Sequence, residues 1–108
     1  MEPLFSDIFH CEVSAISEDA TNYTVECFNK TFSISKASLS LMLFKYFLRY
    51  GYYGVVYDDG EAFGGRLCTN NSSEEIVYST SNDSIHDLML DMAMFTFNKS
   101  KEAFLSNI

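Results

Sequence analysis

Histidine and cysteine side chains often serve as catalytic nucleophiles and bases, and the chain has 2 His and 3 Cys. His10 and Cys11 are neighbours in an alternating segment that predicts a strand, so their side chains point to opposite faces and cannot form a pair. His86 stands beside Asp87 at the start of a predicted helix, where a solvated histidine is the ordinary interpretation. We therefore expect no catalytic residue and no enzyme.

Metal and cofactor motifs are equally absent from the sequence. It has no C-x-x-C, H-E-x-x-H or H-x-x-x-H spacing, so no metal site is predicted. Gly64-Gly65 is followed by Arg66-Leu67 and lacks the lysine of a phosphate-binding loop, so no cofactor is predicted. Three cysteines cannot all pair, and in a reducing compartment we expect them to be small core residues.

Carboxylates form the first unusual pattern. Asp83, Asp87 and Asp91 recur at every fourth position, which would place them on one ridge of a helix. A ridge of this kind could hold a divalent ion, although a solvated face is the expected state. Asp58, Asp59 and Glu61 add charge at a predicted hairpin tip. Ordinary solubility charge is the alternative explanation.

Tyrosines form the second pattern, with five of them between Tyr46 and Tyr57. Along a strand Tyr53 and Tyr57 share one face and Tyr52 takes the other, so some of these rings are expected at the surface. Tyrosine combines a large apolar face with a hydrogen-bonding tip, which suits an interface. Amphipathic sheet packing with wet hydroxyls is the alternative. The predicted partner-binding residues are Asp58, Asp59, Glu61, Asp83, Asp87, Asp91, Tyr52, Tyr53 and Tyr57.

The elements that must position these side chains follow from periodicity. Alternating apolar residues predict strands over 5–16, 23–27 and 32–34, then over 52–57, 62–68 and 75–79. Apolar residues predict a helix over 39–50, with Ser35 or Ser38 as N-cap and Gly51 after its end. A second helix begins near Ile85, and residues 102–108 either continue it or fray.

Turn residues then set the strand register. Asn29-Lys30 predicts a two-residue turn that pairs Val25 with Ile34, and a turn near Asp19 would pair Val13 with Val25. Asp59-Gly60 predicts another hairpin. The element order β-β-β-α-β-β-β-α predicts an α+β fold, an antiparallel sheet with two helices packed on one face.

Length and composition limit the class of protein. The 108 residues are 47% hydrophobic, which favours a single globular domain over 1–108. The net charge of -8 argues against direct nucleic-acid binding, and no apolar run reaches about 18 residues, so no membrane partner is expected. The N-terminal residues lack the features of a signal peptide, so we expect a cytoplasmic protein.

Together these patterns predict a non-enzymatic inhibitor that binds a basic, nucleic-acid-binding surface of a target protein. In size and charge the chain is similar in kind to anti-CRISPR and anti-restriction proteins of phages and mobile elements, although no motif carries that similarity. A toxin-neutralising immunity protein would use the same surface. A small enzyme or ligand-binding domain with a pocket is the alternative of another class. A homodimer through residues 39–50 is compatible with each of these hypotheses.

Overall fold

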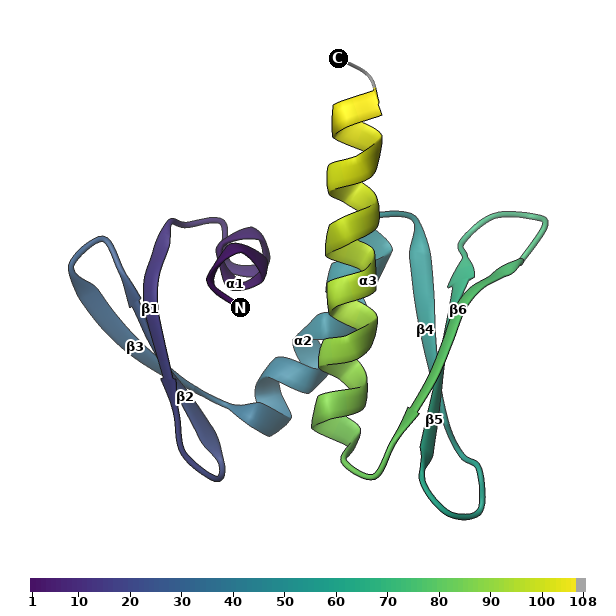
Figure 1. Ribbon diagram of the computed structural model, residues 1–108, viewed down its shortest axis with the longest axis horizontal. Coiled ribbons are helices and arrows are strands. Elements are labelled where there is room, and N and C mark those ends of the chain that lie inside the picture. The colour runs from purple at the N-terminus through teal and green to yellow at the C-terminus, as the bar shows by residue number, and fades with distance from the viewer. Residues whose placement is uncertain (107–108) are drawn as a thin grey trace.

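The computed structural model describes residues 1–106, which form three helices and two separate three-stranded antiparallel sheets (Figure 1). The elements run α1 (Glu2–Phe9), β1 (Val13–Glu18), β2 (Asn22–Cys27), β3 (Lys30–Ser35), α2 (Lys36–Arg49), β4 (Tyr52–Asp58), β5 (Phe63–Thr69), β6 (Ile76–Asn82) and α3 (Ile85–Ser106). The α+β class is confirmed, and the predicted order of eight elements follows α1. A single sheet with two helices on one face is wrong.

Helix α1 replaces the first half of the strand predicted over 5–16. Pro3 lies in its first turn, where a missing N–H costs nothing, and Leu4, Phe5 and Ile8 share its buried face. The spacing of Leu4, Phe5 and Ile8 fits a helical period, whereas the predicted strand was based on the alternation of Phe9, Cys11, Val13 and Ala15 that follows. His10 ends the helix in the left-handed region with φ 55°, so it does not lie on a strand.

The first sheet has a different register from the prediction. Cys27 pairs with Lys30, so the turn is Phe28-Asn29, and both residues have positive φ. Val25 therefore lies opposite Phe32 and, on the other side, opposite Ile16. Between β2 and β3 the shift is two residues, which keeps the paired apolar side chains on one face. Between β1 and β2 the register also slips between Val13 and Ala15, so Ile16 rather than Val13 lies opposite Val25.

The cysteines also depart from the expectation. A disulfide joins Cys11 to Cys27, with their Cα atoms 6.5 Å apart, so these two are not merely small core residues. Cys68 is unpaired and buried.

Helix α2 confirms the predicted caps. Ser35 Oγ accepts a hydrogen bond from the Ser38 N–H, and Gly51 follows the helix with φ 82°. The predicted hairpin between β4 and β5 forms as well, and β6 extends to Asn82 rather than ending at Ser79.

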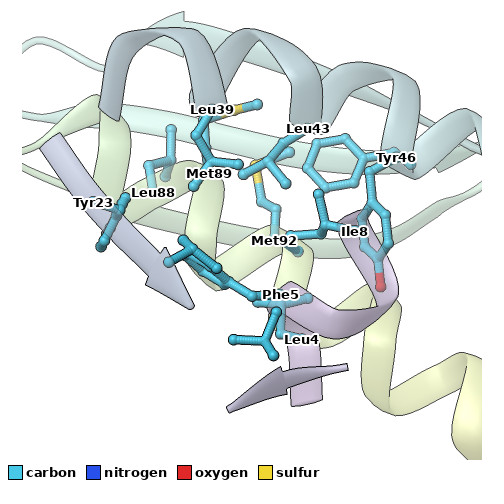
Figure 2. Packing of buried hydrophobic residues seen from close by; sticks show 14 of the residues in the cluster. Leu4, Phe5, Ile8, Tyr23, Leu39, Leu43, Tyr46, Leu88, Met89 and Met92 are labelled. Atoms are coloured by element: carbon cyan, nitrogen blue, oxygen red, sulfur yellow. The ribbon is translucent and has the colours of Figure 1, made fainter. Parts of the chain in front are cut away.

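One cluster of buried side chains joins all three helices to both sheets (Figure 2). Phe5 and Tyr23 come from α1 and β2, Leu43 from α2, and Leu67 and Met92 from β5 and α3. Sheet β4–β6 lies close to α3 at Gly65, where an added Cβ would be only 2.6 Å from the Met92 sulfur. The absence of a side chain at Gly65 allows this close approach. The close approach predicted for this glycine pair is confirmed at Gly65.

Helix α3 passes between the two sheets in Figure 1. Within the described residues it continues to Ser106, and the prediction for 107–108 lies outside them. None of the described helices is long and apolar enough to cross a membrane.

Candidate interaction surface

Negative charge is concentrated in the stretch that contains the second sheet and the start of α3. Arg66 is the only basic residue between Tyr52 and Asp91. The acidic residues of the same stretch are Asp58, Asp59, Glu61, Glu74, Glu75, Asp83, Asp87 and Asp91. This stretch therefore accounts for most of the net charge of -8, and the rest of the chain is nearly balanced.

Strand pairing brings the hairpin tip next to the start of α3. Asp58 lies opposite Phe63, and Phe63 lies opposite Asn82, so one row across the sheet ends beside Asp83. Asp58, Asp59, Glu61 and Asp83 are all exposed. We call these four residues the acidic tip. The fold thus joins two acidic groups that are more than twenty positions apart in the sequence.

The acidic tip is held in shape by its own backbone. Asp59 Oδ1 accepts hydrogen bonds from the N–H groups of Ala62, at 2.7 Å, and Glu61, at 3.1 Å. These two bonds favour the charged carboxylate and lower the pKa of Asp59. Asp58 Oδ1 accepts from the Gly60 N–H at 2.8 Å. The turn consequently presents its charges from a fixed loop.

The predicted carboxylate ridge on α3 is wrong in two respects. Asp83 lies before the helix, which begins at Ile85. Asp91 is half-buried and accepts hydrogen bonds from the hydroxyls of Tyr78, at 2.8 Å, and Thr80. Asp91 therefore ties α3 to β6, and of the three only Asp83 and Asp87 are exposed.

The predicted tyrosines divide between the two faces of the second sheet. Tyr52 lies on the helix-facing side, where its ring centroid is 6.5 Å from that of Phe95. Tyr53 and Tyr57 lie on the opposite face and are partly exposed. Tyr57 is next to the acidic tip in sequence and in space. Tyr52 is thus partly exposed but packs against the core side of the sheet, and Tyr57 is the tyrosine next to the acidic tip.

Arg66 is a residue of this surface that the sequence did not single out. Its guanidinium carbon lies 4.8 Å from the centroid of the Tyr57 ring. That ring also covers Gly64, where an added Cβ would be 2.3 Å from a ring carbon. The Tyr57 ring thus lies over Gly64 and beside Arg66 on the outer face of the sheet.

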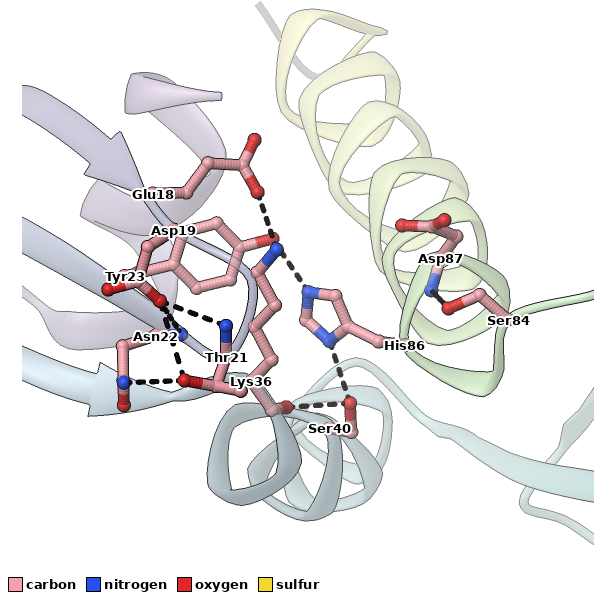
Figure 3. Close-up of polar contacts among 10 residues, drawn as sticks. All are labelled: Glu18, Asp19, Thr21, Asn22, Tyr23, Lys36, Ser40, Ser84, His86 and Asp87. Carbon is pink, nitrogen blue, oxygen red and sulfur yellow. Dashed lines mark hydrogen bonds and ion pairs between the residues drawn. The ribbon is translucent and has the colours of Figure 1, made fainter.

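His86 is buried between two hydroxyls, which corrects the expectation of a solvated histidine (Figure 3). Its Nε2 lies 2.6 Å from the Tyr23 hydroxyl, and its Nδ1 lies 2.8 Å from Ser40 Oγ. Burial lowers the pKa of His86, which favours the neutral imidazole. Burial and the charge of Glu18 raise the pKa of Tyr23 to about 12.

The direction of the protons in this chain follows from Ser40. Its hydroxyl donates to the Lys36 carbonyl at 2.9 Å, so Ser40 Oγ must accept from His86 Nδ1–H. His86 Nε2 then accepts from the Tyr23 hydroxyl. These hydrogen bonds connect β2, α2 and α3 through Tyr23, Ser40 and His86.

A groove of about 440 Å³ adjoins His86 between α2 and α3. It is lined by Ala37, Ser40, Leu41, Phe44, Ile85, His86 and Met89. The lining of this groove is apolar apart from Ser40 and His86. Leu41, Met42 and Leu48 are exposed on α2, while Leu39, Leu43 and Tyr46 are buried within the chain. A homodimer through 39–50 stays a prediction.

The described residues contain no group of three or more His, Cys, Asp or Glu side chains placed to hold a metal ion. Comparison with protein-family models, curated proteins and solved structures gives no match for this chain.

Proposed function

We propose that this chain is a non-enzymatic inhibitor of the anti-CRISPR or anti-restriction type, which docks its acidic tip on a basic, nucleic-acid-binding surface of a target protein. The observation that carries the proposal is the row from Asp58 through Phe63 to Asn82, which joins the hairpin acids to Asp83. Four exposed carboxylates gathered at one end of a sheet offer a basic groove the charge that phosphates would supply.

The physical gain is in steering and competition. Opposite potentials speed the encounter and align the two surfaces, even where each rim ion pair adds little affinity. Tyr57 lies beside the acidic tip and offers a ring to the partner's aliphatic and guanidinium groups. A target whose groove is filled in this way could not bind its nucleic acid, and no covalent step is needed.

The test uses a tip variant in which Asp58→Asn, Asp59→Asn, Glu61→Gln and Asp83→Asn are combined. Asparagine keeps the oxygen that accepts from the turn N–H groups, so the hairpin is preserved while four charges are removed. The matched control removes four exposed charges elsewhere, at Glu2, Glu12, Glu26 and Glu102. Both variants have the same net charge, so a difference between them reports where the charge lies.

Each chain is immobilised and used to capture proteins from a lysate of the native host at low salt. We expect the tip variant to retain about a tenth or less of the bound target, and the control most of it. Added double-stranded DNA or structured RNA should release the target, and affinity should fall as salt rises because exposed charges are screened. Equal losses in both variants, or capture that neither salt nor nucleic acid affects, would contradict the proposal.

A further inference from the structure

A second hollow lies at the other end of α3 from the acidic tip, between α1, the end of α2 and the last turns of α3. Its volume is about 460 Å³, within the range of small-molecule sites. It is lined by Asp7, Tyr50, Phe97, Ser100, Lys101 and Phe104. Three aromatic rings and one carboxylate thus converge on a single hollow from three helices.

The Asp7 carboxylate is held by two tyrosine hydroxyls and forms no ion pair within residues 1–106. The hydroxyls of Tyr46 and Tyr50 both donate to Asp7 Oδ2, at 2.7 and 2.6 Å. Arg49 is close, yet its guanidinium donates to the main-chain carbonyls of Asp7 and Ile8. Within residues 1–106 no ion pair reaches this carboxylate, and both hydroxyls approach the same oxygen.

The aromatic wall of the hollow already accepts a cation. The Lys101 ammonium lies 5.1 Å from the centroid of the Phe97 ring. Phe104, on the next turn, is 68% exposed, so its ring is accessible to a ligand. Aromatic faces attract ammonium and guanidinium groups through the ring quadrupole, and a nearby carboxylate adds charge.

We propose that this hollow binds a small organic cation, whose ammonium or guanidinium group pairs with Asp7 and whose apolar body lies against Phe97 and Phe104. Tyr46 and Tyr50 are positioning residues that hold the carboxylate. Lys101 is an internal competitor, because its ammonium occupies the same aromatic wall. The site is independent of the acidic tip, so either proposal can fail without the other.

Phenethylammonium and its neutral isostere phenethyl alcohol are suitable probes, with binding followed by calorimetry and by NMR shifts of residues 7 and 97–101. We expect the ammonium to bind about tenfold more tightly than the alcohol, because only the ammonium adds a positive charge to the hydrogen bond that it donates to the Asp7 carboxylate. Asp7→Asn should abolish that preference while still accepting from both tyrosines. Lys101→Met should tighten the binding of the ammonium by about threefold.

Asp87→Asn is the matched control, since it removes one exposed charge far from the hollow and should leave both affinities unchanged. Equal affinity of the two probes for the unaltered chain would overturn the proposal without any variant. Weaker ammonium binding in Lys101→Met would overturn it too. Capture of proteins from a host lysate by the immobilised chain distinguishes two sources of the cation. Asp7→Asn should lower the amount of protein captured if the cation is a side chain of a partner protein. It should leave that amount unchanged if the cation is a free small molecule.

Discussion

The two sheets have three antiparallel strands each but are joined to the helices by different interactions. Sheet β1–β3 is connected through a polar chain, in which Tyr23 reaches His86 and Ser40. Sheet β4–β6 is connected through close apolar packing, which the absence of a side chain at Gly54 and Gly65 allows. The first attachment contains a buried histidine, and the second adds to its apolar packing the hydrogen bonds that Tyr78 and Thr80 donate to Asp91.

The two sheets also differ in how far their acidic residues are neutralised within the chain. In the first sheet Glu18 pairs with Lys36 at 2.7 Å, so part of its acidity is neutralised within the chain. The second sheet and its loops have Arg66 alone against several acids. The first sheet thus neutralises part of its acidity within the chain, whereas Asp58, Asp59 and Glu61 of the second sheet's hairpin are exposed and form no ion pair among the described residues.

The largest effect is expected from truncating a buried ring in either half. Phe5→Ala removes a ring that packs edge-to-face on Tyr23, and Phe47→Ala removes the ring that faces Gly54. Both rings are fully buried, so each change should lower the free energy of unfolding by about 3–5 kcal/mol. Because one core joins the halves, amide hydrogen exchange should accelerate in β2 and β5 together. Faster exchange confined to the sheet nearest the mutation would break this picture.

A smaller effect is expected from filling the space under the second sheet. Gly65→Ala would place a methyl group against Met92 and Leu88, both buried, and should cost about 1–3 kcal/mol by overpacking. Gly64→Ala, one residue earlier, points to the outer face and meets the Tyr57 ring, which can swing outward. Urea denaturation should therefore rank Gly65→Ala as the more destabilising change. The opposite order would mean that the outer face packs more tightly than the inner one.

The smallest effect is a dependence of stability on pH that arises from His86, where α3 contacts Tyr23 of the first sheet. The fold lowers the pKa of His86 below its usual 6.5, so the unfolded chain binds a proton more readily than the folded one. The contribution of His86 is therefore fully present above pH 6.5 and is lost as pH falls through the lower, folded pKa. Urea denaturation between pH 5 and 8 should show this loss.

Two variants sharpen the pH prediction. His86→Gln should flatten the dependence below pH 6.5, because the buried imidazole that resists protonation is gone. His10→Asn removes an exposed imidazole at a left-handed position that asparagine tolerates, and should leave the slope as it is. If His10→Asn flattens the slope and His86→Gln does not, the titrating group has been assigned to the wrong residue.

The candidate surface was only partly predictable. The hairpin acids were identified from an Asp-Gly turn, a local signal, and they are exposed as expected. The role of Asp91 was not predictable, because its partners Tyr78 and Thr80 come from a strand whose position relative to α3 no local pattern encodes. Asp7 gave no signal at all, since Tyr46 and Tyr50 are some forty positions away.

What the sequence alone determined is the local part of the fold: the caps of α2 at Ser35 and Gly51, the hairpin at Asp59-Gly60 and the start of α3. These depend on backbone conformation and on hydrogen bonds between near neighbours, which residue type controls directly. The tertiary structure alone decided that 2–9 is a helix, that the strands form two sheets, and that His86 is buried. Each of these depends on which distant apolar surfaces pack together, and the short apolar pattern of 5–16 fits a strand or a helix equally well until a partner selects one.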